Sequence, residues 1–475
     1  MRPNGYTLEP SADDMRSMID LAADRIVAHV ASLAEQPATA VEEGPAVARA
    51  LAEPLPEAGT GFPELLELLF DRAIPTSFNS AGPGYLAYIP GGGVFASAVA
   101  DLVANAVNRY VGVWLAAPGL VQLEANVIRW FCDIVGLPEG AGGILTTGGS
   151  LANFTALVTA RRERLPEDFL RGTIYASQEV HHSLQKAAMM AGFPEGNVRE
   201  ISVNDRFEVH ADRLAERLRQ DRQEGWQPFM VVGSAGTANT GAVDDLVRLA
   251  DIAAEEDLWF HVDGAYGGFF MLTERGRAAL AGIERADSVA MDPHKGLFLP
   301  YGMGSLLVRD PETLRRAHST FADYMPEMQE DRDFVDFCEL SPELSRDFRG
   351  LRAWLPVKLY GIDAFRAALD EKLDLARWVT DVLRDEADME ILAEPQLSLN
   401  AFRLAPDGYS AEQLNELNRR LLAGINARKN VFLTGTVLNG RFALRICVLS
   451  FRTHRDRMEQ CVVDIRESVR EVLAP

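Results

Sequence analysis

Strand-like and helical segments alternate along most of the chain, and this alternation limits its possible folds more than any other feature of the 475 residues. Most of the strand-like segments are separated by segments in which apolar residues recur at helical spacing. A strand, a helix and a second strand in succession build a parallel sheet with helices on both faces. Such sheets bind ligands at the carboxyl ends of their strands. The expected strands are residues 143–146, 173–177, 229–233, 258–263 and 288–292.

The first 80 residues are expected to form a helical arm ahead of this fold. Ser11 and Asp14 make a start that resembles a capping box, and apolar residues follow at helical spacing up to Val30. Arms of this kind often pack on a partner subunit. An ordinary surface helix explains the pattern equally well, so the sequence leaves both interpretations open.

Two further units follow residues 1–80. Residues 81–345 carry the alternating pattern and are expected to form a large ligand-binding domain. Its last part, residues 327–345, is charged and weakly periodic, which is typical of a mobile lid over an active site. Residues 346–475 combine a long helical stretch with a few strand-like pieces, which predicts a smaller C-terminal α/β domain.

Charge and cysteine content exclude several classes of protein. The 69 acidic and 47 basic side chains give a formal net charge of −22, which disfavours binding to nucleic acid and to acidic membrane surfaces. No apolar run approaches the roughly 18 residues of a membrane span, and the N-terminus lacks an apolar signal-peptide core. The four cysteines have no CxxC spacing, which argues against a disulfide scaffold and against a metal site. We therefore expect a cytoplasmic protein.

Two fragments near strand ends suit a phosphate and a flat ring. In "TTGGSLANFTAL", Gly148, Gly149 and Ser150 expose backbone N–H groups at the start of an expected helix, and such groups bind anions. The lysine of a P-loop is missing, which disfavours a nucleoside triphosphate. A plain strand-to-helix turn is equally compatible with the glycines. His181 follows the strand at 173–177, although a lone histidine there is more often structural.

Two further fragments add a carboxylate and an amine. Asp263 ends an apolar strand in "LWFHVDGAYGG", where a carboxylate is costly unless it is paired. A protonated ring nitrogen of a ligand is one candidate partner, and an ordinary loop cap is the alternative. Lys295 in "DPHKG" follows another expected strand. A lysine in a partly desolvated site near other positive charge can lose its proton and form a Schiff base.

Together the four fragments supply the parts of a pyridoxal phosphate site. The sequence resembles the group II pyridoxal-phosphate-dependent amino acid decarboxylases, which include aromatic-L-amino-acid and glutamate decarboxylases. The resemblance runs from "GPGYLAYIPGG" through "HVDGAYGG" and "DPHKG" to "FALRICVLSFRTHRDRM". It implies the PLP-dependent transferase fold type I (aspartate-aminotransferase-like), a homodimer, and release of an amine and carbon dioxide from an L-amino acid.

The resemblance also implies roles for individual residues around the cofactor ring. Lys295 would form the Schiff base, and Asp263 would pair with the pyridine nitrogen. His181 would stack on one face of the ring and Ala265 would pack on the other. Thr237 matches a family segment, but the resemblance gives it no definite role.

At the phosphate end, the resemblance implies that Gly148, Gly149 and Ser150 bind the phosphate with help from His294. Asp292 stands near the phosphate, where many relatives have asparagine. The sequence offers no explanation for this carboxylate.

The family segment that lines the substrate pocket corresponds to Tyr88, Ile89 and Pro90. No arginine stands in this segment, so we expect an aromatic or bulky apolar amino acid rather than an acidic one. Gly112 falls where aromatic decarboxylases carry a large residue, which predicts an enlarged pocket. An acidic amino acid as substrate, or another fold-type-I reaction, are the alternatives.

Phe337 leaves the product open. In the aromatic decarboxylases a lid tyrosine supplies a proton to the α-carbon, and counting back from "RDFRG" places Phe337 at that position. A phenyl ring cannot donate a proton. In related plant enzymes phenylalanine here accompanies decarboxylation-coupled oxidative deamination to an aldehyde. A packing role for Phe337, with the proton coming from His181 or water, and a shift of the register to Phe334 are the other possibilities.

Overall fold

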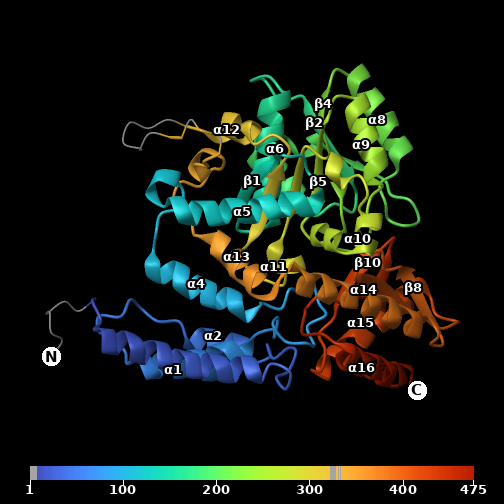
Figure 1. The fold of residues 1–475 in the computed structure, drawn as a ribbon. Coiled ribbons are helices and arrows are strands. Elements are labelled where there is room, and N and C mark those ends of the chain that lie inside the picture. The colour runs from blue at the N-terminus through green and yellow to red at the C-terminus, as the bar shows by residue number, and fades with distance from the viewer. Residues whose placement is uncertain (1–7, 321–327, 330, 332, 475) are drawn as a thin grey trace.

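The computed structural model describes residues 8–320, 328–329, 331 and 333–474, and Figure 1 shows its two sheets with the helices around them. A seven-stranded sheet in the order β1-β7-β6-β5-β4-β2-β3 forms the centre of the large domain. Neighbouring strands are parallel except where β7 meets β1 and β6, so the predicted mostly parallel sheet is confirmed. The strands are β1 (Gly142–Thr146), β2 (Gly172–Ser177), β3 (Val198–Ile201), β4 (Gln227–Ser234), β5 (Trp259–Gly264), β6 (Ser288–Met291) and β7 (Gly304–Val308).

Helices cover both faces of this sheet because its central strands are apolar on both sides. Val231 of β4 packs with the helix layer that contains α5, α8 and α9, whereas Met230 and Val232 pack with α6 and α7 on the other face. The helices of this domain are α4 (Phe95–Val107), α5 (Pro118–Val135), α6 (Gly149–Arg164), α7 (Ser183–Met190), α8 (Ala211–Gln223), α9 (Leu246–Glu255), α10 (Glu274–Ala279), α11 (Pro293–Gly296), α12 (Glu312–His318) and α13 (Arg349–Tyr360).

The C-terminal part contains a second, antiparallel sheet in the order β10-β11-β9-β8. The boundary expected at residue 346 lies before α13, yet α13 packs on α4 and α5, and the Gly350 amide donates to Glu124 at 3.0 Å. By packing, α13 therefore belongs with the large domain, and the start of the small domain stays a prediction. Its elements are α14 (Ile362–Arg384), β8 (Met389–Ala393), β9 (Leu399–Leu404), α15 (Ala411–Ala427), β10 (Thr434–Leu438), β11 (Arg441–Cys447) and α16 (Arg455–Leu473).

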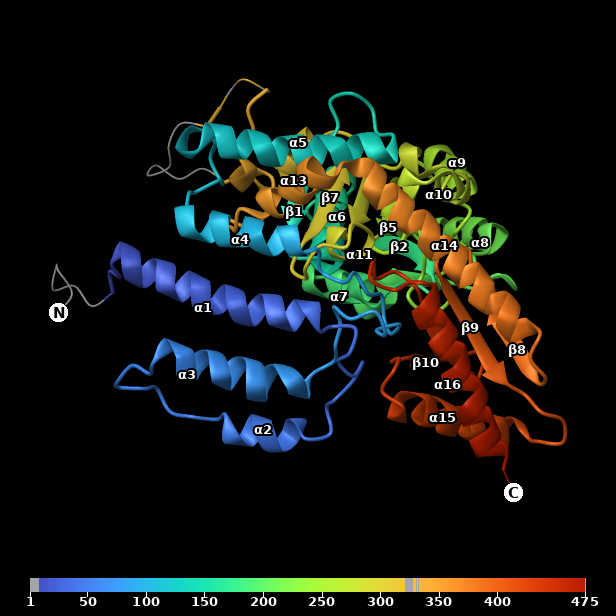
Figure 2. The ribbon, with the colours of Figure 1, turned by 60° about the horizontal axis from the view of Figure 1, so that its bottom comes forward.

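The N-terminal arm contains α1 (Ala12–Ala31), α2 (Gly44–Ala50) and α3 (Phe62–Glu67). Ser11 and Asp14 form the predicted capping box, with each side chain accepting the other residue's backbone N–H. Figure 2 shows α1 and α3 side by side in a layer next to α4. No residue of α1 is buried, and its apolar stripe is exposed in the single chain.

The expected lid is described only in part, because residues 327, 330 and 332 lie outside the described residues. From residue 333 onwards it includes a short 3₁₀ turn at Phe337–Glu339, and Asp336 accepts a hydrogen bond from the Trp114 amide at 2.6 Å. The mobility of this segment stays a prediction. Within the described ranges, no helix is both long and apolar enough to cross a membrane.

Candidate active site

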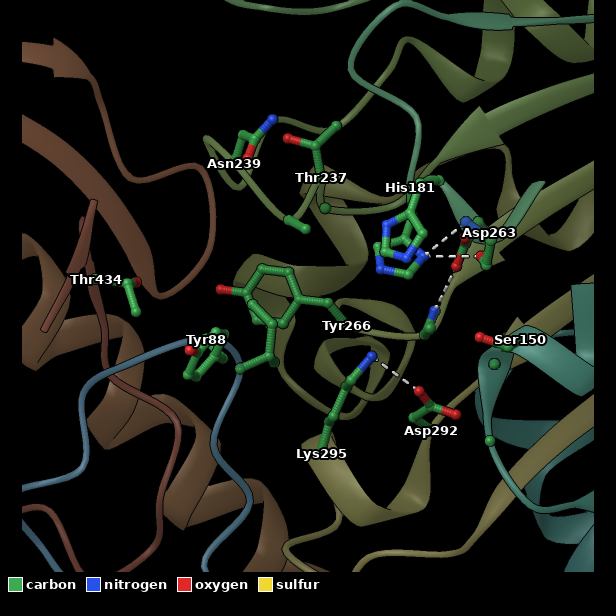
Figure 3. A pocket seen from close by; sticks show the side chains of 18 of the residues that line it. Tyr88, Ser150, His181, Thr237, Asn239, Asp263, Tyr266, Asp292, Lys295 and Thr434 are labelled. Carbon is green, nitrogen blue, oxygen red and sulfur yellow. Dashed lines mark hydrogen bonds and ion pairs between the residues drawn. The ribbon is translucent and has the colours of Figure 1, made fainter. Parts of the chain in front are cut away.

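A cavity of about 1010 Å³ opens at the carboxyl ends of the parallel strands. Figure 3 shows side chains from the large domain on one side and Thr434, from the small domain, on the other. The strand ends converge here because β2, β4, β5 and β6 all run in one direction. Every residue predicted to bind the cofactor lines this cavity: Gly148, Gly149, Ser150, His181, Thr237, Asp263, Ala265, Asp292, His294 and Lys295.

The glycine turn forms one end of the cavity. Gly149 is the first residue of α6, whose N-terminal amides and dipole favour an anion. A Cβ atom on Gly149 would lie 3.0 Å from the Ala265 Cβ and 3.2 Å from the Asp292 Oδ2, so a larger residue would fill the space. His294 is adjacent, since its Cε1 lies 3.5 Å from where a Gly148 Cβ would stand. This end suits a phosphate group.

Asp263 stands at the end of β5 with a side chain that is largely buried. Its Oδ2 accepts a hydrogen bond from the Asn153 Nδ2 at 2.9 Å, and its Oδ1 accepts one from the Ala265 amide at 3.1 Å. No ion pair joins it to a cation in the described part of the chain. A buried carboxylate without a cationic partner suits a ligand that carries positive charge on a ring nitrogen.

Lys295 lies in the short helix α11, immediately after β6. Its Nζ is 2.8 Å from the Asp292 Oδ2, as Figure 3 shows, and the His294 Nε2 is 3.6 Å from the same oxygen. Burial disfavours the charge on Lys295, but the Asp292 carboxylate outweighs burial and raises the pKa of the amine. The expectation that positive neighbours would help Lys295 lose its proton is therefore wrong for this structure, because the nearest charged group is an anion.

Asp292 itself is 2% exposed, and its Oδ1 has no hydrogen-bond partner among the described residues. A buried carboxylate oxygen without a partner is unfavourable in the chain alone. Asp292 lines the cavity beside Gly149, so this oxygen can take up a proton or accept a hydrogen bond from a ligand.

His181 follows β2 and faces the cavity near Asp263 (Figure 3). Its Nδ1 lies 2.8 Å from the Ser183 Oγ, and the Ser183 amide donates to the same nitrogen at 3.3 Å. Burial lowers the pKa of His181, which favours the neutral ring.

Of the residues predicted to contact the substrate, Tyr88 and Ile89 line the cavity, whereas Pro90 and Gly112 do not. Phe337, predicted to be catalytic, is 1% exposed and does not line the cavity. Its ring packs against the Arg346 guanidinium, whose Cζ lies 4.9 Å from the ring centroid. Gly112 and Phe337 are neighbours, because the Cys338 amide donates to the Gly112 carbonyl at 3.0 Å. The fold thus brings these two residues together, but not into the cavity of their own chain.

Several cavity residues escaped prediction. Asn153 lies one helical turn after Gly149, so helix periodicity could have placed it beside the glycine turn. Arg445 and Phe432 reach the cavity from the small domain, and Tyr85 packs on the Phe432 ring. The Arg445 Nη1 donates to the Thr434 Oγ1 at 2.9 Å and its Nε donates to the Asn239 carbonyl at 3.0 Å.

Comparison with known proteins gives consistent matches over nearly the whole chain. Residues 63–405 match the pyridoxal-dependent decarboxylase conserved domain. An aromatic-L-amino-acid decarboxylase of Bacillus atrophaeus is 34% identical, covering 98% of this chain and 97% of the relative. Tryptophan decarboxylase 2 of Oryza sativa is 30% identical, and the match covers 89% of this chain and 88% of that relative. The structure of Oryza sativa TDC with PLP and tryptamine superposes with a TM-score of 0.93 at 27% identity, and the match covers 98% of this chain and 100% of that one.

Proposed function

The chain belongs to the pyridoxal-dependent decarboxylase family, and on that premise we propose that it removes the α-carboxylate of an aromatic L-amino acid as carbon dioxide and releases the amine. It is an amino acid decarboxylase that uses pyridoxal phosphate. The observation that carries the proposal is the convergence of Lys295, Asp263 and His181 on one cavity beside the glycine turn. When bound, the cofactor supplies a ring that accepts the electrons left at the α-carbon as carbon dioxide departs.

The residues fit that group. Lys295 would hold the cofactor covalently, and the buried Asp263 would stabilise positive charge on the ring nitrogen. His181 and Ala265 would lie against the two faces of the ring. The neutral His181 ring can donate a hydrogen bond into the cavity but carries no excess proton near neutral pH, since burial lowers its pKa.

The phosphate end would be held by backbone N–H groups of the glycine turn, Gly148, Gly149 and Ser150, together with His294. The His294 Nδ1 lies 2.5 Å from the Met303 carbonyl, so it donates its proton there and leaves Nε2 facing Asp292. Thr237 would contribute a wall beside the ring, with its hydroxyl 2.8 Å from the Thr240 hydroxyl.

An aromatic substrate is supported by the aromatic residues of the cavity wall. Tyr85 and Phe432 lie with ring centroids 5.9 Å apart, and Tyr88 is 6.4 Å from Tyr85. These rings line the cavity together with Ile89 and offer the offset contacts that aromatic side chains prefer. The names of the two curated relatives point the same way.

Arg445 favours a second candidate, an acidic amino acid. It is a buried cation on the cavity wall, and no carboxylate pairs with it among the described residues. Its guanidinium also holds the carbonyls of Ala238 and Asn239, which orients it along the wall. In the aromatic interpretation the same charge attracts the α-carboxylate that every amino acid carries.

We also propose that the active unit is a homodimer. The exposed apolar residues of α1, including Met15, Met18 and Ile19, form a face that a second copy could cover. Gly112 and Phe337 lie together outside the cavity of their own chain, as residues contributed to a partner's cavity would. Light scattering should give a mass of about twice 52.2 kDa. A monomer with full activity would refute this part.

The test of the proposed activity is incubation of the purified protein, loaded with pyridoxal phosphate, with tryptophan, tyrosine and phenylalanine against glutamate and aspartate. Carbon dioxide, amine, ammonia and peroxide are all measured. Equal amounts of carbon dioxide and amine from an aromatic substrate support the proposal. Turnover of the acidic pair alone would assign the substrate to the second candidate. Absence of carbon dioxide with all five would refute decarboxylation of these substrates.

A further inference from the structure

A buried chain of hydrogen bonds runs behind the cavity and ends at two of its functional groups. The Trp259 Nε1 donates to the Ser288 Oγ at 2.8 Å, and that oxygen lies 2.8 Å from the His261 Nδ1. The His261 Nε2 lies 3.0 Å from the Asn153 Oδ1. The side chain of Asn153 then reaches Asp263 at 2.9 Å and the Ser183 Oγ at 3.1 Å.

The two ends of this chain fix the direction of every hydrogen bond in it. An indole N–H can only donate, so the Ser288 Oγ accepts from Trp259 and keeps its own proton available for the His261 Nδ1. His261 is fully buried, and burial lowers its pKa to about 4, so the ring is neutral and carries a single proton. At the far end the Asp263 carboxylate can only accept.

The consequence falls on Asn153. Its Nδ2 gives one hydrogen to Asp263, which can only accept, and one to Ser183. Its Oδ1 therefore faces His261 and accepts from Nε2, which places the His261 proton on that nitrogen and leaves Nδ1 to accept from Ser288. The reversed amide would place an oxygen against the Asp263 carboxylate and a donor against the His261 donor. Both contacts are unfavourable in a buried site.

The same direction continues to His181. Ser183 accepts from Asn153, so its hydroxyl proton is directed to the His181 Nδ1, which also accepts from the Ser183 amide. A nitrogen that accepts two hydrogen bonds carries no proton in the neutral ring. The proton of His181 therefore lies on Nε2, which has no partner among the described residues.

We propose that His261 is a positioning residue, which acts through Asn153 to hold Asp263 as a hydrogen-bond acceptor and to keep the His181 proton on Nε2, toward the cavity. The inference rests on the proposed function, because it assigns these two groups to the cofactor. His261 does not line the cavity, so its effect passes through Asn153.

The variants His261→Leu and His261→Gln separate positioning from packing. Leucine fills space but donates nothing to Asn153, whereas a glutamine amide can donate to the Asn153 Oδ1 as the imidazole does. His318→Leu is the matched control, because His318 is another histidine whose pKa burial lowers to about 4. It is hydrogen-bonded to the Thr159 Oγ1 at 3.0 Å and does not line the cavity. Ser288→Ala tests the chain one step further back.

The main readout is the nitrogen shifts of ¹⁵N-labelled histidine, which distinguish the two neutral tautomers for each of the eight histidines. A His181→Gln sample assigns the His181 signals. The native protein and His318→Leu should show the Nε2–H form for His181 and His261. His261→Leu should give His181 a mixture of tautomers, His261→Gln should restore the single form, and Ser288→Ala should mix the tautomers of His261.

Kinetics and the spectrum of the bound cofactor provide the second readout. In His261→Leu we expect kcat to fall roughly tenfold or more with KM changed by less than about threefold, and the pH dependence of the visible absorbance to shift. His261→Gln should recover most of the rate. A pure Nε2–H tautomer of His181 in His261→Leu, or an Nδ1–H tautomer of native His261, would overturn the proposal. The tautomers are read whether or not the protein decarboxylates an aromatic amino acid, so failure of the proposed function is a separate result.

Discussion

The substitution Asp263→Asn tests the electrostatic core of the site. The Asp263 carboxylate accepts from Asn153 at 2.9 Å and from the Ala265 amide at 3.1 Å. An amide has one acceptor oxygen, so either orientation turns its NH₂ group against one of these donors. A buried donor left without a partner costs about 1–3 kcal/mol, and we expect the free energy of unfolding to fall by that amount.

The loss of charge affects the reaction separately. A hydrogen bond to a charged group contributes about 1.5–3 kcal/mol, so losing the interaction with a positive ring nitrogen should lower kcat by roughly 10- to 150-fold. The assay measures amine release together with the absorbance spectrum of the bound cofactor. Chemical denaturation of the same samples gives the stability change.

Asp244→Asn is the matched control for this experiment. Asp244 is also buried and accepts two backbone N–H groups, from Val209 at 2.6 Å and Ser234 at 2.8 Å, but it does not line the cavity. Its substitution should lower stability by a similar amount while kcat and the cofactor spectrum stay unchanged. An Asp263→Asn protein with the native kcat would show that the carboxylate is structural and would refute the reasoning.

Three further predictions concern Asp292, Phe337 and the lid. Burial opposes the charge on Lys295, but Asp292 raises the pKa of its amine, so the neutral amine forms only at high pH. Asp292→Asn should therefore move the pH midpoint of cofactor reconstitution, followed by visible absorbance, to lower pH. An unchanged midpoint would contradict this. If the wild type releases some aldehyde, Phe337→Tyr should raise the ratio of amine to aldehyde, because tyrosine can donate a proton. Wild-type turnover with no peroxide and no oxygen uptake would show that no aldehyde forms and would refute this prediction. Limited proteolysis should cut within 327–345 first, with protection by a substrate analogue, and early cleavage elsewhere would count against the lid.

Local sequence signals placed the strand ends and therefore most of the site. The apolar run before Asp263 became β5, and the glycines at 148 and 149 stand at the start of α6. Because parallel strands end at one edge of a sheet, residues that follow them meet without any further information. This is why Lys295, His181 and the glycine turn could be assigned together.

Features that depend on packing between distant segments could not be predicted in this way. The proximity of Arg445 to the cavity depends on how the small domain meets the large one, which no local pattern records. The ion pair between Lys295 and Asp292 follows from the short helix that joins them, and it reverses the expected protonation of the amine. The position of Phe337 was inferred by counting along a loop, and the single chain packs that loop away from its own cavity.

The measurement that tests the central claim most directly is borohydride reduction of the purified protein loaded with pyridoxal phosphate, followed by mass spectrometry of its peptides. We predict one pyridoxyl group per chain, on Lys295, and its loss in Lys295→Ala. The other lysines of the sequence, Lys186, Lys358, Lys372 and Lys429, serve as internal controls. A pyridoxyl group on one of those lysines, or a native protein that reduction leaves unlabelled, would contradict the assignment of this cavity as the active site.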